Sequence, residues 1–215
     1  MAGSGTGTPV SASAYPVTLA EAKAHLNIEH DDDNTLITAL IASATDYIER
    51  LTDIQFITGN VTLKLDKFPS GAEFYTGHDW RPTLNDAETY NSIRLTKSPV
   101  ISIGSITYLD TAGASQTLST DVYALDITKA VGRVHLKYNQ SWPDIRGDVN
   151  GITITYSAGY GVDGSTAPDS LKSAIKLLVG HWHENREAAV QGQVVRAVPF
   201  AVASLIGANK LGRLV

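Results

Sequence analysis

The chain has 215 residues, a formal net charge of −5 and no cysteine, which excludes disulfide bonds, thiolate metal sites and cysteine nucleophiles. Hydrophobic residues make up 43% and charged residues 18%, so the composition excludes a disordered chain and suits one domain, or one domain with an inserted lobe. No basic stripe of a general nucleic-acid binder and no run of about 18 apolar residues occurs, so we expect a soluble protein made in the cytoplasm.

The first predicted element is a helix that follows a Gly/Ser/Thr-rich start. Residues 1–15 lack the basic start and apolar run of a signal peptide, and we interpret them as a flexible arm. Thr18 and Glu21 have the spacing of a capping box, which predicts a helix from Thr18 to about Asn27. It opens a helical part that we expect to span residues 16–58.

The second helix is the clearest element in the sequence. An acidic run, Asp31 to Asp33, precedes it and lacks the glycine and glutamate of an EF-hand loop, so we predict that these residues cap the helix. The helix itself is predicted from apolar residues at helical spacing, and their stripe requires a buried partner. The stripe consists of Leu36, Ile37, Leu40, Ile41, Ala44, Tyr47, Ile48 and Leu51.

Residues 59–160 show a different pattern. Short segments rich in Val, Ile, Thr and Tyr alternate in part with polar residues and are separated by turn signals. They predict a β-rich lobe with an antiparallel sheet, either a small sandwich or a barrel-like sheet. The segments are VTLKL, SIRL, ISIGSITYL, VYALDI, GRVHLKY and GITITYSA.

The helical period returns in residues 161–198. Pro168 suits the first turn of a helix, where its missing N–H costs nothing. Residues 199–215 form a short apolar C-terminal segment. We therefore predict an α+β fold in which the N-terminal and C-terminal helices pack together, with an antiparallel β region in the centre of the chain. The C-terminal helix has the stripe Leu171, Ile175, Leu178 and Trp182.

The segment GHWHENRE concentrates polar and aromatic residues on this last helix. His181 and His183 diverge by about 200° on a helix and do not chelate one ion together. His183 and Glu187 share a face, but two ligands make a weak metal site, so we predict a solvated or interfacial pair. A small metal-dependent enzyme that uses His183 and Glu187 stays as the alternative. Asn185 and Arg186 border the apolar stripe and need hydrogen-bond partners there, which fits an interface.

Two further motifs carry less weight. Gly159 to Gly164, GYGVDG, matches the glycine spacing of a dinucleotide site, but four residues intervene before the helix and no acidic strand follows. We predict a tight connection with positive φ angles instead. The polar and aromatic loop with Tyr75, His78 and Trp80 could line a pocket or an interface. The sequence predicts no catalytic residue, no cofactor and no metal ligand.

Several segments, in this order, resemble the head–tail connector (adaptor) family of tailed phages and gene transfer agents. The resemblance covers about residues 16–206, and its most specific part is the helix with GHWHENRE. The segments are VTLAEAKAHLNIEHDDDN, ERLT, SPVISIGSITYLDTAG, VYALD, a WP turn, ITITYSAGYG, SLKSAIKLLVGHWHENREAA and VPFAVASLI.

The resemblance implies a non-enzymatic structural protein of the virion, assembled in the host cytoplasm and located at the head–tail junction. Such adaptors form a ring, usually of twelve copies, beneath the portal protein. The ring extends the channel through which DNA passes without specific binding, and it provides the platform for the next neck or tail protein, a stopper or a tail terminator. No membrane is involved. Another neck component, such as a stopper or tail terminator, is a further alternative; these are often smaller and β-rich.

The resemblance also implies where the contacts lie. The helix with Arg186 and Glu187 helps to build the ring, and residues 199–215 contact the portal. The predicted interface residues are Trp182, Asn185, Arg186, Glu187, Pro199, Phe200, Leu205, Ile206, Lys210 and Arg213.

Overall fold

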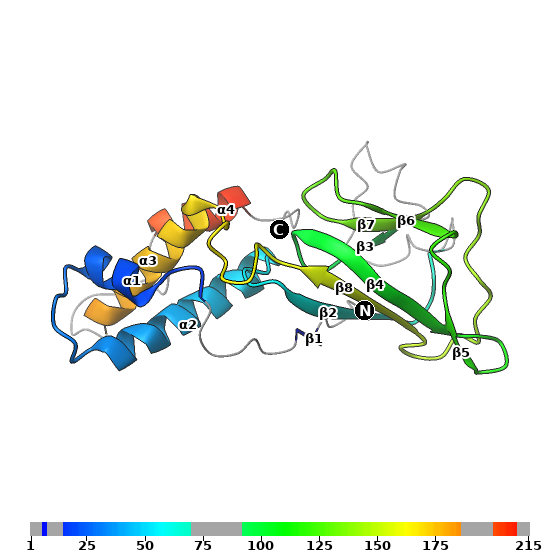
Figure 1. Ribbon diagram of the computed structural model, residues 1–215, viewed down its shortest axis with the longest axis horizontal. Coiled ribbons are helices and arrows are strands. Elements are labelled where there is room, and N and C mark those ends of the chain that lie inside the picture. The colour runs from blue at the N-terminus through cyan, green and yellow to red at the C-terminus, as the bar shows by residue number, and fades with distance from the viewer. Residues whose placement is uncertain (1–5, 8–14, 70–91, 186–199, 210–215) are drawn as a thin grey trace. The chain divides into compact units, whose positions relative to one another are not determined.

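The computed structural model describes residues 6–7, 15–69, 92–185 and 200–209 (Figure 1). The loop with Tyr75, His78 and Trp80 lies outside these residues. The chain divides into two compact units, which we name by their content. The helical unit is residues 10–58 with 159–215, and the β unit is residues 1–9 with 59–158.

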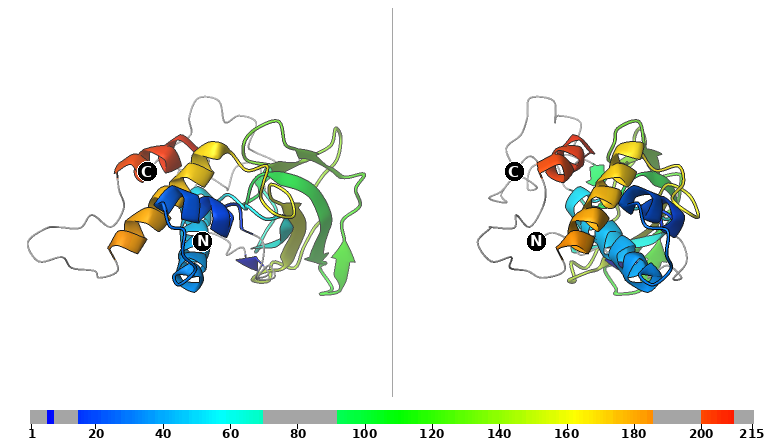
Figure 2. Two further views of the ribbon diagram at one scale, coloured as in Figure 1. Left: turned by 60° about the vertical axis from the view of Figure 1, so that its left-hand side comes forward. Right: turned by 90° about the vertical axis from the view of Figure 1, so that its left-hand side faces the viewer.

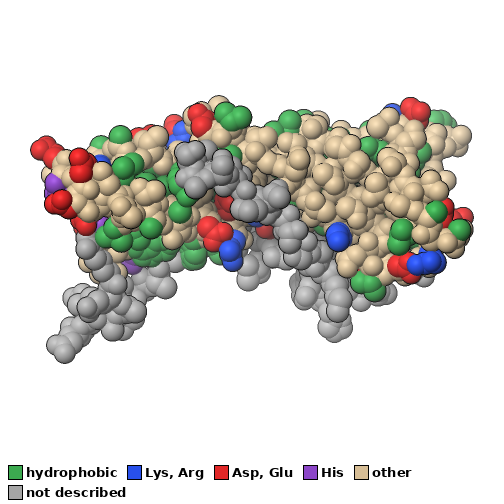
Figure 3. All heavy atoms as spheres, turned by 60° about the horizontal axis from the view of Figure 1, so that its bottom comes forward, with side chains coloured by type: hydrophobic (Ala, Val, Ile, Leu, Met, Phe, Trp, Pro, Cys, Tyr) green, Lys and Arg blue, Asp and Glu red, His purple; other side chains and the backbone are tan. Residues whose placement is uncertain are grey.

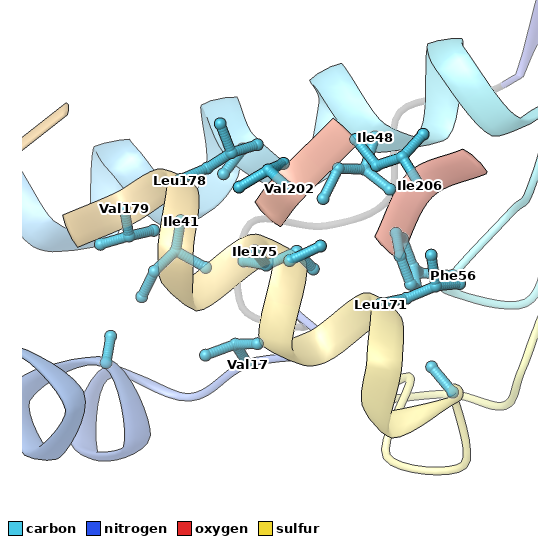
Figure 4. Packing of buried hydrophobic residues seen from close by; sticks show 14 of the residues in the cluster. Val17, Ile41, Ile48, Phe56, Leu171, Ile175, Leu178, Val179, Val202 and Ile206 are labelled. Atoms are coloured by element: carbon cyan, nitrogen blue, oxygen red, sulfur yellow. The ribbon is translucent and has the colours of Figure 1, made fainter. Parts of the chain in front are cut away.

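The described part of the helical unit contains four helices that share one hydrophobic core. Helix α3 contacts the other three helices, and α2 also contacts α1 and α4. The core contains fully buried side chains from α2 and α3 together with Val202 and Ile206 (Figure 4). None of these described helices is long and apolar enough to cross a membrane. The bounds are α1 Leu19–Leu26, α2 Asn34–Thr52, α3 Asp169–Glu184 and α4 Phe200–Asn209.

The capping box predicted at the start of α1 is confirmed. The Glu21 N–H donates to Thr18 Oγ1 at 3.2 Å, and the Thr18 N–H donates to Glu21 Oε2 at 2.7 Å. These bonds from Thr18 hold the pKa of the Glu21 carboxyl below its usual value. At the other end, Asn27 has the left-handed conformation, with φ 56°, and its N–H donates back to the helix. Both predicted ends of α1 are therefore correct.

The apolar stripe predicted for α2 is correct except at its last position. Ile37, Ile41 and Ile48 are almost fully buried, but Leu51 is 38% exposed and Thr52 is buried in its place. The Thr52 hydroxyl donates to Ile48 O at 2.7 Å, so its burial leaves no unpaired polar group. The sequence pattern predicted a buried Leu51 because only apolar residues were assigned to the stripe. A threonine whose hydroxyl bonds within the helix can take such a buried position as well.

The described part of the β unit contains two antiparallel sheets that enclose a second core, and the α+β prediction is confirmed. The sheets have the strand orders β1-β2-β8-β4-β5 and β3-β7-β6, and they are not closed into a barrel. Side chains from both sheets contribute to the core, as in a small sandwich. The bounds are β1 Thr6–Gly7, β2 Gly59–Leu65, β3 Ser92–Arg94, β4 Val100–Leu109, β5 Ser115–Thr117, β6 Tyr123–Asp126, β7 Arg133–Leu136 and β8 Ile152–Ala158.

Strand β8 is the centre of the larger sheet. Its burial alternates along its length, and Ile154 and Tyr156 are fully buried. The Tyr156 hydroxyl accepts a hydrogen bond from the Lys97 N–H at 2.8 Å, so this large side chain is buried with its polar atom bonded. Figure 2 shows the strong curvature of the sheet along β4, whose pairing with β8 contains two register shifts.

The β6–β7 hairpin carries a well-bonded ion pair. Arg133 Nε lies 2.8 Å from Asp126 Oδ2, and the two side chains are only 19% and 14% exposed. The Thr128 hydroxyl and N–H donate to the other carboxylate oxygen at 2.6 and 2.9 Å. The bonds from Thr128, and then the one from Arg133, hold the pKa of Asp126 well below its usual range.

Candidate interaction surface

The glycine-rich segment before α3 forms a close connection, as predicted. Gly159, Gly161 and Gly164 have φ angles of 137°, 112° and 67°. The Thr58 N–H donates to Gly161 O at 2.8 Å, and the Gly161 N–H donates to Thr58 Oγ1 at 2.9 Å. A Cβ added at Gly159 would lie 2.5 Å from the Thr58 backbone. The glycines therefore serve a tight approach of two backbone segments.

His183 at the end of α3 pairs with an acidic residue at the start of α2. Its Nε2 lies 3.3 Å from Asp33 Oδ2, and the two side chains are 17% and 27% exposed. Asp33 occupies the N-cap position of α2, but its side chain makes no capping hydrogen bond, so the predicted capping by this carboxylate is wrong. The carboxylate is turned to His183 instead. A carboxylate at a helix N-terminus complements the helix dipole.

The other polar residues of GHWHEN have separate partners. Asn185 is the C-cap of α3: its N–H and its Nδ2 donate to His181 O at 3.1 and 2.8 Å. The half-buried Trp182 packs edge-on against Tyr47 of α2, with ring centroids 6.1 Å apart. The two histidines thus have different neighbours, in line with their predicted divergence on the helix.

The metal interpretation of this segment rests on Glu187, which lies outside the described residues. Among the residues that the structure describes, no three His, Cys, Asp or Glu side chains are grouped so that they could hold a metal ion. His183 has a carboxylate partner within its own unit. The geometry therefore favours the interpretation of His183 as one member of a helix-joining pair.

Helix α4 presents the most distinctive surface of the helical unit. Its sequence FAVASLIGAN contains no charged residue. Val202 and Ile206, spaced by one turn, are buried against the core, whereas Phe200 at its start is 80% exposed. The exposed positions on the rest of the helix hold small residues: Ala201, Ala203, Ser204, Gly207 and Ala208. An uncharged helix face with an exposed aromatic residue is typical of a surface that meets another protein.

The turn between α1 and α2 has the opposite character. Glu29, Asp31 and Asp32 are all exposed, and Figure 3 shows acidic side chains gathered at this end of the helical unit. Lys23 Nζ lies 2.7 Å from Asp31 Oδ1, and this hydrogen bond lowers the pKa of the Asp31 carboxyl. Lys23 pairs with only one of these carboxylates, so the turn keeps a net negative charge.

Residues 16–77 match the sequence model of a family described as Phage gp6-like head-tail connector protein. The matched family is the one that the sequence resembles, and the match covers less than a third of the chain. The match begins just before the capping box of α1 and includes the whole of α2 and β2. A comparison with curated proteins found no match.

Solved structures extend the likeness over the whole chain. A chain in the neck of an empty gene transfer agent (GTA) particle, computed with C6 symmetry, has a TM-score of 0.72 at 20% identity, covering 99% of this chain and 97% of its own. A chain in the virion of a native GTA particle has a TM-score of 0.72 at 21% identity, covering 98% and 97%. A chain in the neck of a native GTA particle, computed with C12 symmetry, has a TM-score of 0.67 at 22% identity, covering 100% and 98%. These likenesses show a shared fold.

The structure describes half of the predicted interface residues, and they fall into two groups. Trp182 and Asn185 end α3, where one packs on Tyr47 and the other caps the helix. Phe200, Leu205 and Ile206 lie on α4, where they are exposed, half-buried and buried, respectively. Whether they meet a partner stays a prediction. Arg186, Glu187, Pro199, Lys210 and Arg213 lie outside the described residues.

Proposed function

We propose that this chain is a structural head–tail connector, an adaptor that forms a ring in the neck of a tailed particle. The observation that carries the proposal is the connector-family match of residues 16–77, within a chain whose whole fold resembles GTA neck proteins. No catalytic role is proposed. The ring stands at the head–tail junction of the virion and extends the DNA channel below the portal.

The number of copies in the ring follows the symmetry of the portal that it meets, and we propose twelve. The solved neck structures that share this fold were computed with C12 and C6 symmetry, which supports a cyclic arrangement. A ring requires a head-to-tail contact between two different faces of the chain, with a rotation that closes. The formal net charge of −5 is compatible with DNA that slides past without specific binding.

We further propose that α4, with the rest of residues 199–215, contacts the portal. The support is the character of the helix: it is uncharged, it is anchored by Val202 and Ile206, and it exposes Phe200. Exposed aromatic side chains are frequent energetic centres of protein interfaces. The other face of the ring would then receive a stopper or a tail terminator.

An adaptor is favoured over a stopper or tail terminator by the helical unit. The described residues hold two long helices, α2 and α3, of 19 and 16 residues, which pack on each other. The alternatives are expected to be β-rich without long helices at both ends of the chain. The β unit alone would not separate these possibilities, whereas the helical unit does.

Native mass spectrometry of the purified chain, alone and mixed with its candidate portal ring, tests this function. We expect binding in a ring stoichiometry and no metal adduct. A monomer before mixing agrees with the proposal, because many adaptors form their ring only when they bind the portal. A chain that ignores the portal and carries one tightly bound metal ion would refute the proposal.

The substitution Phe200→Asp tests the portal contact. We expect at least about a tenfold loss of portal binding, because the aromatic side chain that the portal would cover is replaced by a charge that must lose its water on binding. The matched control is Val162→Asp, since Val162 in the same unit is 83% exposed and Phe200 is 80% exposed. Both variants should keep the melting temperature of the free chain. Equal portal binding by both variants would remove Phe200 from the interface.

A further inference from the structure

The outer face of the larger sheet carries rows of hydroxyl groups that cross β8. Along this strand every second residue is buried in the core, and the residues between them are Thr153, Thr155 and Ser157. Directly opposed residues lie on the same face of a sheet, and β4 places a serine or threonine opposite each of these three. Strands β2 and β5 add Thr62 and Thr117 to the same rows. We call this set the hydroxyl face: Thr62, Ser102, Ser105, Thr107, Thr117, Thr153, Thr155 and Ser157.

The hydroxyl face is accessible and almost without charge. All eight side chains are half-buried or exposed. Within the part of the chain that the structure describes, their hydroxyls make one hydrogen bond to protein, from Thr107 Oγ1 to Thr153 O at 3.5 Å. The two other residues that β2 places in these rows are Asn60 and Lys64, so the described rows contain one cation and no carboxylate.

The composition of the hydroxyl face differs from that of a protein–protein interface. Interfaces are enriched in aromatic residues, methionine and arginine, whereas serine is depleted and both serine and threonine are rare among the residues that dominate the binding energy. Serine and threonine hydroxyls are, in contrast, among the groups that contact phosphate oxygens in protein–DNA complexes. The face therefore fits a phosphate backbone better than a protein partner.

The charges of the two units favour the same ligand. The described residues of the helical unit include 11 acidic and 4 basic residues, a net charge of −7. Those of the β unit include 6 acidic and 8 basic residues, a net charge of +2. A polyanion is repelled by the helical unit and attracted weakly by the β unit. Of the described surfaces, those of the β unit are thus complementary to DNA.

We infer that the hydroxyl face contacts the phosphate backbone of the duplex DNA that passes through the ring. The inference rests on the proposed function and names the surface that lines the channel. A neutral hydroxyl exchanges a hydrogen bond to water for one to phosphate at little net gain, and it reads no base sequence. Only Lys64 adds the strong electrostatic attraction of a cation. Repeated in every copy, such a face guides the duplex without holding it.

A photoreactive label tests the contact. The chain has no cysteine, so a single introduced cysteine can carry a benzophenone maleimide. Thr155→Cys places the label in the middle of the hydroxyl face. The matched control is Ala124→Cys, since Ala124 is also half-buried but lies on β6 of the smaller sheet, between the core residues Tyr123 and Leu125 and on the side away from the core.

The labelled chains are assembled on the portal, mixed with a fluorescent linear duplex that can thread the ring, and irradiated. Denaturing electrophoresis then measures the covalent adduct between protein and DNA. We expect at least tenfold more adduct from Thr155→Cys than from Ala124→Cys. Rings that form and give equal adduct at the two positions would overturn the inference. If the unmodified chain forms no ring on the portal, the proposed function itself fails and the inference falls with it.

A charge added to the hydroxyl face provides a second measurement. Thr155→Lys adds one cation per copy, and we expect the assembled ring to bind the duplex at least tenfold more tightly at low salt, with a steeper decline as salt rises. Ala124→Lys is the control and should change the affinity much less. The melting temperature of each free chain shows that the variants are folded. An equal gain in affinity from the two lysines would contradict the inference, because the position of the charge would then not matter.

Discussion

Replacing Ile48 by alanine tests how the core of the helical unit is built. Ile48 is fully buried in the cluster that contains Val202 and Ile206 (Figure 4). Removing three carbons loses about 2.4 kcal/mol of transfer free energy, at about 0.8 kcal/mol per CH₂. The cavity adds on the order of 1 kcal/mol, and the higher helix propensity of alanine offsets about 0.4 kcal/mol. We expect Ile48→Ala to lower the free energy of unfolding by about 3 kcal/mol.

Leu51→Ala is the matched comparison on the same helix. It also removes three carbons, but Leu51 is 38% exposed, so water fills the space and we expect a loss of about 1 kcal/mol. Urea unfolding followed by circular dichroism at 222 nm measures both variants, with the unfolding slope m checked for constancy. Equal losses of unfolding free energy in the two variants would refute the reasoning. The sequence pattern assigns Ile48 and Leu51 to the same buried stripe, whereas the structure buries only Ile48.

Three other predictions concern a connection, an ion pair and a cap. Gly159→Ala should lower the free energy of unfolding by at least about 2 kcal/mol more than Gly147→Ala does. Both glycines have positive φ, but only a Cβ at Gly159 would collide with backbone atoms. Thermal unfolding of the two variants measures the difference. The folded-state pKa of Asp126 lies below its unfolded value, so the stability that Asp126 contributes is present above about pH 4 and is lost as the pH falls further. The melting temperature of Asp126→Asn should therefore decline less between about pH 5 and pH 3 than that of the parent chain. Thr18→Ala should cost about 1 kcal/mol and speed amide exchange in the first turn of α1.

Controls make each of these results interpretable. Asp144→Asn changes an exposed carboxylate in the same unit and should keep the pH profile of the parent chain. Thr18→Ser keeps a hydroxyl at the cap and should keep most of the stability of α1. A pH profile that is unchanged by Asp126→Asn, or a cost for Gly159→Ala no larger than for Gly147→Ala, would contradict the corresponding argument.

Elements with a strong local signal could be predicted from the sequence. Helix α1 has a capping box at one end and an asparagine with positive φ at the other, and α2 and α3 have apolar residues at helical spacing. The strands with apolar alternation, such as β8, were also predicted. Strands β1 and β5 were not, because they have two and three residues and no apolar side chain that would signal a buried face.

The contacts of the candidate surface depend on residues far apart in the sequence. Asp33 and His183 are separated by 150 positions, so no local pattern indicates that the carboxylate pairs with the imidazole instead of capping α2. Asn185 was predicted at an interface because it borders an apolar stripe, and the structure adds its role as the C-cap of α3. A signal for this role was present, since asparagine is frequent where helices end.

The main segment of the β unit, residues 59–158, begins and ends at two adjacent points of the backbone. In the helical unit, Tyr160 N–H donates to Phe56 O at 2.9 Å beside the bonds between Thr58 and Gly161. In the β unit, Gly59 is the register partner of Ala158. A segment whose two ends meet in this way can be replaced as one unit. Evolution can lengthen, shorten or exchange this segment by recombination at these two adjacent points while the helices stay unchanged.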